Sequence, residues 1–386
     1  MNFPESEFAG RYERLREELE RAEIDALLVT NEANFNYFTG YIAAHPWVSY
    51  SRNLIAILPR EGSPVLIAPE FLSAEARSES WIERVYPSTD VGAAPIAVVA
   101  AALWDLGLQS ARIGAELGYE QRLGISLRDF DRLRAEHPRV EFVDASAVIW
   151  KLRMRKSAAE VDCLRDACRV TDRALARLFA GMGAGMSERD IARRLGQLLL
   201  EEGADRVGWI MMTSGRDQYH RTFGRPRTRV PEPGDMVWLD VSAIVNGYGA
   251  DFDRAAVVGG PTREQQDLQR AVHEATMAGI EVIRPGAAVG SIVAAVSDAL
   301  DRAGLQRLEA GRIGHGIGLQ SSEPPDVALT DATVLEPGMV ITVEPAIVRD
   351  HGIYQVEQNV AVTGTGYENL SRSSPELRAT PASPVQ

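Results

Sequence analysis

The first 145 residues alternate between helical and extended hydrophobic patterns. Apolar side chains recur every three or four positions over residues 8–22, which predicts an amphipathic helix. Short continuous apolar runs at 24–30 and 53–59 predict buried strands instead. The other expected elements are strands at 64–69 and near 83–86, 111–115 and 140–143, and helices at 71–80, 93–108 and 126–136. Regular alternation of this kind is typical of an α/β domain.

The second half combines long helices with strands. Ser157 and Glu160 form a capping-box pattern, which predicts a helix that continues to Met182. Ser187 is the expected N-cap of the next helix. The later expected elements are strands at 207–213, 236–243, 248–258, 339–348 and 353–363, and helices at 262–283 and 288–303. We therefore expect an α+β chain with two domains, 1–150 and 151–386, and a Pro/Ser-rich tail from Ser371 that frays.

The composition is that of an ordinary soluble globular protein, with 45% hydrophobic and 25% charged residues. A net charge of −13 argues against a nucleic-acid surface. No apolar run approaches the roughly 18 residues that a membrane span needs. The charged N-terminus also lacks the apolar core of a signal peptide. Cys163 and Cys168 are interpreted as reduced thiols, so we expect a cytoplasmic protein.

Candidate chemistry is concentrated first in the stretch VWLDVSAIVNGYGADFDR. Asn246-Gly247 is a strong signal for a two-residue hairpin turn. Such a turn would place Asp240 opposite Asp253 and make Asp251 a diagonal neighbour of Asp240 on the same face. Carboxylates this close repel each other unless a cation lies between them. The stretch therefore predicts a metal site.

Three later residues have surroundings that suit the same chemistry. His315 lies among glycines in GHGIG, and glycines allow a backbone to fold tightly around a ligand. Glu344 ends the β-branched run ITVE, and Glu357 is expected inside the strand YQVEQNV. A charge buried in a strand is costly unless it is paired or bound to a metal. With Asp240 and Asp251, these residues form a ligand set suited to two divalent ions such as Mn, Co, Zn or Fe.

The order of these motifs resembles the creatinase, prolidase and methionine aminopeptidase family, whose catalytic domain has the pita-bread fold. The matching pieces are LDVSAIVNGYGADFDR, GHGIGL, TVEPA and VEQNVAVT. Upstream, RYERLREELERAEIDALLVTNEANFNYFTGY and KLRMRKSAAEVDCLRDACRVTDRAL resemble the N-terminal domain and linker helix of the creatinase, prolidase and aminopeptidase P branch. The resemblance covers about residues 10–372. It implies a C-terminal pita-bread domain preceded by a smaller α/β creatinase-type domain.

By this resemblance, Asp251 and Glu357 would bridge two metal ions. Asp240 would chelate one of these ions, and His315 and Glu344 would bind the other. A hydroxide held between two metal ions is nucleophilic near neutral pH, because the ions lower the pKa of bound water. Glu344 would also move a proton to or from that hydroxide. The family further implies a homodimer that acts on a short peptide or another small molecule.

Two histidines of the family's peptidases are absent here. The first normally follows the GHGIGL-like stretch and helps to hold the tetrahedral intermediate. Ser322 takes its place, before a retained Glu323, and a hydroxyl does not titrate near pH 7. The second normally begins a His-Gly-x-Pro stretch, and Phe223 occupies that position in FGRP. His220 lies only three residues earlier and could fill this role through a shifted loop.

Two expectations concern the surroundings of the site. Asp253 shares the strand face of Asp251, and we expect it to support the site or to form a salt bridge with Arg221. By the family resemblance, a loop of the N-terminal domain would reach the active site of another subunit. The alternative is a surface loop packed by its own aromatic side chains. The candidate substrate contacts in that loop are His45, Trp47, Tyr50 and Arg52.

The sequence therefore predicts a dinuclear metal-dependent hydrolase, with Xaa-Pro dipeptidase or aminopeptidase activity as the first expectation. Its candidate catalytic residues are Glu344, His220 and Ser322. Because two family histidines are replaced, a second hypothesis keeps the fold but changes the substrate to a non-peptide metabolite, as in creatinase, ectoine hydrolase or dimethylsulfoniopropionate lyase. A third hypothesis is a binding module without metal, which the intact ligand set disfavours.

Overall fold

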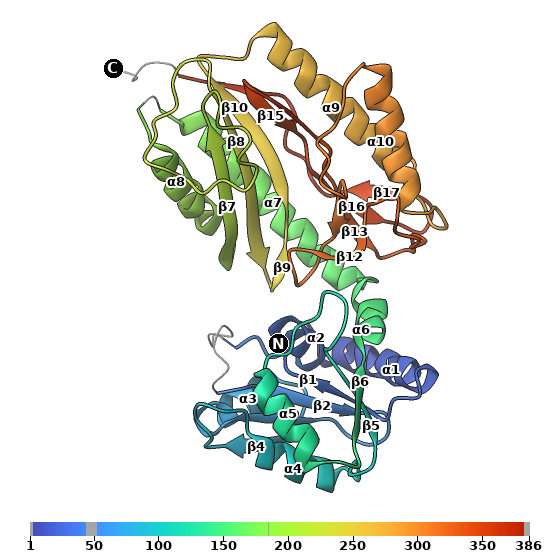
Figure 1. The fold of residues 1–386 in the computed structure, drawn as a ribbon. Helices are drawn as coiled ribbons and strands as arrows, with labels where there is room; N and C mark the ends of the chain where they lie inside the picture. Colours follow the sequence, from blue (N-terminus) through green and yellow to red (C-terminus); the bar gives the residue numbers. More distant parts are fainter. Residues whose placement is uncertain (1–2, 44–51, 184, 382–386) are drawn as a thin grey trace. The chain divides into compact units, whose positions relative to one another are not determined.

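The computed structural model describes residues 3–43, 52–183 and 185–381. His45, Trp47 and Tyr50 lie outside the described residues, whereas the guanidinium of Arg52 lies 5.6 Å from the ring centroid of Phe71. The chain divides into two compact units, Met1–Arg153 and Met154–Gln386 (Figure 1). In the described part of the chain, no helix is both long enough and apolar enough to cross a lipid bilayer.

The N-terminal unit is a six-stranded mixed sheet with helices around it (Figure 1). The strand order is β4-β3-β2-β1-β5-β6, and the β1–β2 and β2–β3 pairs are antiparallel. The elements are α1 (Glu5–Arg21), β1 (Ala26–Val29), α2 (Glu32–Thr39), β2 (Ile55–Pro59), β3 (Val65–Pro69), α3 (Ser73–Glu79), β4 (Arg84–Ser88), α4 (Ile96–Asp105), β5 (Arg112–Ala115), α5 (Leu127–Glu136), β6 (Glu141–Asp144) and α6 (Ser146–Arg153). This arrangement confirms the predicted α/β domain.

The C-terminal unit contains two five-stranded sheets and a two-stranded hairpin. One sheet has the order β18-β10-β8-β7 with β9 beside β8, and the other has the order β12-β11-β13-β16-β17. The helices are α7 (Ala158–Gly181), α8 (Glu188–Glu201), α9 (Arg263–Glu281) and α10 (Gly290–Arg302). Helices α7 and α8 lie along the first sheet, and α9 and α10 lie beside the second (Figure 1). This architecture is the pita-bread fold that the resemblance implies, and it makes the whole chain α+β.

The strands of this unit supply the framework of the site. Those of the first sheet are β7 (Arg206–Ser214), β8 (Met236–Val245), β9 (Tyr248–Gly249), β10 (Phe252–Val258) and β18 (Arg378–Thr380). Those of the second sheet are β11 (His315–Gly316), β12 (Glu323–Asp326), β13 (Val340–Val343), β16 (Gln358–Val362) and β17 (Tyr367–Asn369), and the hairpin consists of β14 (Ala346–Arg349) and β15 (Gly352–Gln355). The tail does not fray as predicted up to residue 381, because β18 pairs in parallel with β10.

Local sequence signals account for the helix starts and for the central hairpin. The Ser157 side chain accepts from the backbone of Glu160 in a complete capping box, which confirms the predicted start of α7. At the hairpin tip, Asn246 and Gly247 have φ angles of 52° and 86°, the left-handed values that a type I′ turn requires. The resulting register places Asp253 directly opposite Asp240, as the sequence predicts.

Three long predicted strands are each divided in two. The strand expected at 248–258 becomes β9 and β10, with Asp251 in the break. The expected strand at 339–348 is β13 followed by β14, and Glu344-Pro345 lies in the break between them. A proline cannot donate to a strand ladder, so the chain leaves the five-stranded sheet there and enters the hairpin. The expected strand at 353–363 likewise divides into β15 and β16. Glu357 lies in that break, so its predicted position inside a strand is wrong.

Candidate metal centre

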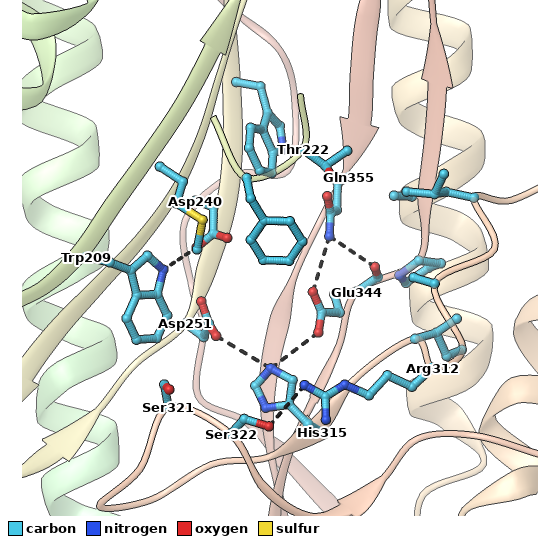
Figure 2. Close-up of a pocket in the computed structure, with 18 residues that line it drawn as sticks. Trp209, Thr222, Asp240, Asp251, Arg312, His315, Ser321, Ser322, Glu344 and Gln355 are labelled. Carbon is cyan, nitrogen blue, oxygen red and sulfur yellow. Dashed lines mark hydrogen bonds and ion pairs between the residues drawn. The ribbon is translucent and has the colours of Figure 1, made fainter. Parts of the chain in front are cut away.

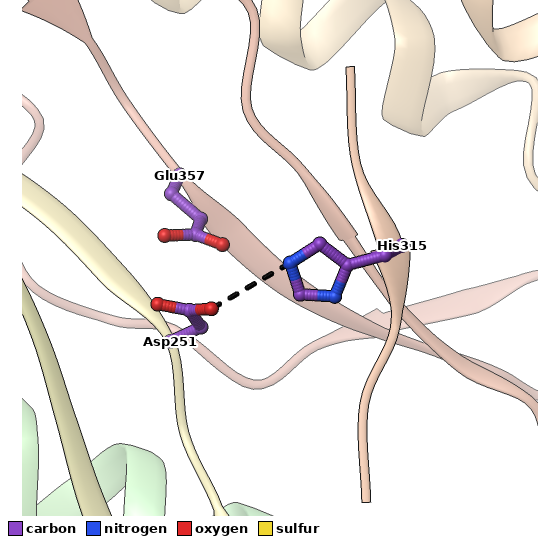
Figure 3. A group of neighbouring side chains, drawn as sticks. All are labelled: Asp251, His315 and Glu357. Carbon is purple, nitrogen blue, oxygen red and sulfur yellow. Dashed lines mark ion pairs between the residues drawn. The ribbon is translucent and has the colours of Figure 1, made fainter. Parts of the chain in front are cut away.

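The structure brings the five predicted metal ligands together from separate segments of the C-terminal unit (Figure 2 for four of them, Figure 3 for Glu357). They are Asp240 on β8, Asp251 just before β10, His315 on β11, Glu344 after β13 and Glu357 before β16. His315 Nε2 lies 3.6 Å from Asp251 Oδ2 and 3.4 Å from Glu344 Oε1. Asp251, His315 and Glu357 each offer a ligand atom, and these atoms lie within 4.8 Å of one another (Figure 3).

A fifth acidic side chain belongs to the same cluster. Asp253, Glu344 and Glu357 form a second group of ligand atoms within 4.8 Å of one another. The proposed salt bridge between Asp253 and Arg221 is not formed, because Arg221 Nη2 instead donates to the backbone oxygen of Arg225. Alternation along β10 turns Asp253 toward the same side as Asp251, and this side carries the other carboxylates.

Asn359 and Thr342 fix the backbone of two ligands, although the sequence did not single them out. Asn359 Nδ2 donates to the oxygen of Asp251 at 2.5 Å, and its Oδ1 accepts from the Asp251 N–H at 3.2 Å. Asp251 thus keeps its backbone hydrogen bonds although it lies outside the strand ladder. The Thr342 hydroxyl accepts from the His315 N–H at 3.1 Å. The position of Asn359, two residues after a ligand in VEQNVAVT, is the only sequence signal for its role.

The glycines around His315 are required by close backbone contacts. A Cβ on Gly314 would lie 2.1 Å from the oxygen of Thr342, and a Cβ on Gly316 would lie 2.2 Å from the oxygen of Pro324. Side chains at either position would therefore push away the strands β12 and β13 on either side of β11. His315 Nδ1 lies 2.9 Å from the oxygen of Gly316. A proton on Nδ1 would leave the lone pair of Nε2 directed at the carboxylates, which is the form that a metal ion binds.

Burial shapes the electrostatics of the cluster. It raises the pKa of Asp240 to about 6, and burial together with the charge of Asp240 raises the pKa of Glu344 to about 7. Burial and neighbouring carboxylates hold the pKa values of Asp251 and Glu357 well above their usual range. Burial lowers the pKa of His315 to about 4. A neutral imidazole among crowded carboxylates is the donor set that a divalent cation requires.

Two carboxylate oxygens provide an independent test of whether a cation fits. Asp253 Oδ1 and Glu357 Oε1 are buried, and neither has a hydrogen-bond partner among the described residues. Unpartnered buried oxygens are costly, and a bound cation would remove that cost. The residues present therefore fit a divalent metal centre with mostly oxygen ligands and one nitrogen ligand.

The cluster lies in a cavity of about 450 Å³ (Figure 2). Apolar side chains that line it include Trp209, Met211, Phe223, Trp238 and Ile313, and polar ones include Arg312, Ser321, Ser322 and Gln355. Trp209 Nε1 donates to Asp240 Oδ1 at 2.5 Å. The cavity thus combines an acidic floor with apolar walls.

Arg312 is a cavity residue that the sequence reasoning missed. Its Nη2 donates to Ser322 Oγ at 3.0 Å (Figure 2). Its Nη1 lies 2.5 Å from Asp326 Oδ1. The charge of Arg312 lowers the pKa of both His315 and Glu344, which shows that it acts on the cluster electrostatically. Ser322 lines the cavity as predicted. Its hydroxyl accepts from a guanidinium there, in the place where related peptidases carry a histidine.

His220 does not reach the cavity. The preceding side chain, Tyr219, is 2% exposed, and its hydroxyl donates to the oxygen of Met236 at 3.0 Å. With Tyr219 directed inward, the neighbouring His220 is exposed and is not among the residues that line the cavity. Phe223 lines it instead, so the shifted-loop hypothesis for His220 has no support in this structure.

Comparisons with known proteins identify both units. Residues 162–364 match Metallopeptidase family M24, and residues 11–155 match the Creatinase/Prolidase N-terminal domain. An uncharacterized peptidase of Bacillus subtilis is 26% identical over 95% of this chain and 99% of its own. The Xaa-Pro dipeptidase from Bacillus anthracis has a TM-score of 0.85 at 26% identity, covering 96% of this chain and 99% of that chain. The dipeptidase PepE from Mycobacterium ulcerans has a TM-score of 0.84 at 27% identity, covering 98% and 99%.

Proposed function

This chain belongs to metallopeptidase family M24, and on that premise we propose that it is a dinuclear metal-dependent hydrolase that cleaves short Xaa-Pro peptides. One observation carries the proposal. Four candidate ligands line one cavity, and the fifth, Glu357, groups with Asp251 and His315 and has a buried carboxylate oxygen without a partner among the described residues. The likeness to an Xaa-Pro dipeptidase over 96% of this chain supports the substrate class.

Several of the clustered side chains would bind the metal ions. Asp240, Asp251, His315 and Glu357 would hold the ions together with Glu344. When bound, the ions would polarise the substrate carbonyl and acidify a water molecule. Asp240 is oriented by Trp209 Nε1, which donates to one of its carboxylate oxygens.

Glu344 is the proposed proton carrier. Its Oε1 accepts from Thr342 Oγ1 at 3.3 Å, and its Oε2 accepts from Gln355 Nε2 at 3.2 Å. These two contacts set the plane of the carboxylate while it lines the cavity. A carboxylate in this position can take a proton from the attacking water and deliver it to the leaving nitrogen of the peptide bond.

Two donors suit the polar atoms of a peptide. The guanidinium of Arg312 is a positively charged donor, so it can stabilise negative charge on the substrate where related peptidases use a histidine. Ser322 accepts one of its hydrogen bonds and so positions the guanidinium. Trp238 Nε1 also lies against this cavity, is buried and has no partner among the described residues. The apolar walls formed by Trp209 and Phe223 suit a proline ring or another apolar group.

A second candidate keeps the metal chemistry and changes the substrate to a small non-peptide C–N compound or a sulfonium acid. The observation that favours it is the absence from the cavity of both histidines that related peptidases use, since Ser322 and Phe223 line it and His220 does not. The family resemblance also supports manganese as the working ion and a homodimer, which metal analysis and sedimentation would test.

The test is a substrate panel for the purified enzyme loaded with Mn²⁺ or Co²⁺. Xaa-Pro dipeptides, longer Xaa-Pro peptides and dipeptides without proline are compared with creatine, ectoine and dimethylsulfoniopropionate. Release of proline from Xaa-Pro dipeptides is the expected result. If every peptide stays intact and one of the metabolites is converted, the second candidate replaces the first.

A further inference from the structure

Asp253 is a carboxylate that the five-ligand set leaves without a function. The residue is only 1% exposed and lies directly opposite Asp240 in the β8–β10 pair. Its Oδ1 has no hydrogen-bond partner among the described residues. Burying a carboxylate in this way is unfavourable unless a cation or a donor compensates for the lost water. If Asp253 had only a structural role, a neutral side chain would be less costly to bury at this position.

The position of Asp253 gives it access to the metal ligands. One of its oxygens lies within 4.8 Å of ligand atoms of both Glu344 and Glu357. Glu357 Oε1 is the other buried carboxylate oxygen in this cluster without a partner among the described residues. The two unpartnered oxygens thus belong to residues of the same three-membered group.

The backbone that carries Asp253 is fixed relative to that of Glu357. Arg254, itself 2% exposed, donates from Nη1 to the backbone oxygens of both Asp253 and Glu357, each at 2.8 Å. Its Nε donates to Ser373 Oγ at 2.8 Å. One buried guanidinium therefore ties β10 to the segment before β16. Such fixed spacing is what a preorganised ligand pair requires.

Building on the proposed dinuclear function, we propose that Asp253 is a sixth metal ligand, which binds beside Glu344 and Glu357. The other group of neighbouring ligand atoms, from Asp251, His315 and Glu357, contains an imidazole nitrogen. Carboxylate sets suit hard ions such as Mn²⁺, whereas an imidazole also suits Zn²⁺ and Fe²⁺. Asp253 therefore adds a hard oxygen ligand to the centre, and this addition favours Mn²⁺.

The test counts metal ions and does not depend on finding a substrate. Wild-type protein, Asp253→Asn and Asp253→Ser are stripped of metal, equilibrated with Mn²⁺ by dialysis and analysed for ions per chain. Two ions are expected for the wild type. In both variants, we expect one ion to bind as in the wild type and the affinity for the other to fall at least tenfold. Asp129→Asn, at a buried aspartate of the N-terminal unit, is the matched control and should bind like the wild type.

Thermal unfolding of the metal-free proteins separates loss of a ligand from loss of fold. Removing one charge from a crowded acidic cluster should raise the melting temperature of metal-free Asp253→Asn and reduce the further rise caused by Mn²⁺. Two ions bound with unchanged affinities in both variants would overturn the role of Asp253 and leave the dinuclear centre standing. Fewer than two ions in the wild type would instead overturn the dinuclear proposal itself.

Discussion

Lys156 Nζ lies 3.1 Å from Glu323 Oε2, and each side chain is only 1% exposed. The other oxygen of Glu323 accepts from the Gln320 N–H at 3.1 Å, so the ion pair fixes the loop that leads from the GHGIGL stretch to Ser322. A Cβ on Gly318 would lie 2.7 Å from the same carboxylate, which explains the glycine at this position of the GHGIGL stretch. The retained Glu323 therefore stabilises the loop that carries Ser322, which lines the cavity.

Breaking this buried pair should be costly. We expect Lys156→Met to lower the free energy of unfolding by about 3–5 kcal/mol, because an uncompensated carboxylate stays buried. The neighbouring Arg155 pairs with Glu336 on the surface, where the side chains are 57% and 50% exposed. Arg155→Met should therefore cost less than about 1 kcal/mol. Urea unfolding of the two variants gives both values, and equal losses would contradict the prediction.

Removing metal should destabilise the C-terminal unit. The buried carboxylates repel one another when no cation lies among them. At a metal concentration 100 times its dissociation constant, binding to the native state adds about 2.7 kcal/mol per site. We expect a chelator to lower the melting temperature and Mn²⁺ to restore it. An unchanged melting curve after complete removal of metal would be inconsistent with a metal centre in this cluster.

The stability of the metal-free protein should depend on pH. Burial raises the pKa of Asp240 to about 6 and that of Glu344 to about 7, whereas unfolded carboxyl groups titrate near pH 4. A raised native pKa gives stability that is present below the unfolded value and lost as pH rises through the native value. The metal-free protein should thus lose stability between about pH 4 and 7. The lowered pKa of His315, about 4, has the opposite effect on stability, but it is only one group against several carboxylates. Melting temperatures across this range, with chelator present, provide the measurement.

Glu344→Gln should separate proton transfer from substrate binding. Loss of a general acid–base group typically lowers the rate 10²- to 10⁴-fold, and the glutamine also weakens one metal ligand. We expect kcat to fall by at least a factor of about 10² on the substrate that the panel identifies. Glu336→Gln, at a half-exposed surface glutamate, is the control. Metal content measured on the same samples shows how much of the loss reflects the ion.

Arg312→Gln should weaken stabilisation of negative charge on the substrate. Hydrogen bonds to charged groups contribute about 1.5–3 kcal/mol, so kcat/KM should fall roughly 10- to 150-fold. Arg312→Lys keeps the charge and should recover part of this loss. Ser322→Ala removes only one hydrogen bond to the guanidinium and should have a smaller effect. If Ser322→Ala is as damaging as Arg312→Gln, the hydroxyl itself contacts the substrate.

Periodicity and turn chemistry determined one part of the site from the sequence alone. The Asn246-Gly247 turn sets the register of β8 and β10, and a strand period of two then places Asp240, Asp251 and Asp253 on one face. The capping box at Ser157 set the start of α7 in the same local way. These features involve residues close in sequence, so short-range rules suffice for them.

Contacts between distant segments decided the rest. Glu344 and Glu357 reach the cluster because their strands break and change sheets. Pro345 marks the first break, but no local pattern marked the second. Asn359 holds Asp251 across 108 positions of sequence. The buried Tyr219 side chain keeps His220 outside the cavity, whereas Arg312 enters it. The sequence determined which chemistry the chain carries, but the packing of two sheets decided which side chains share the cavity, because burial is a property of the whole fold.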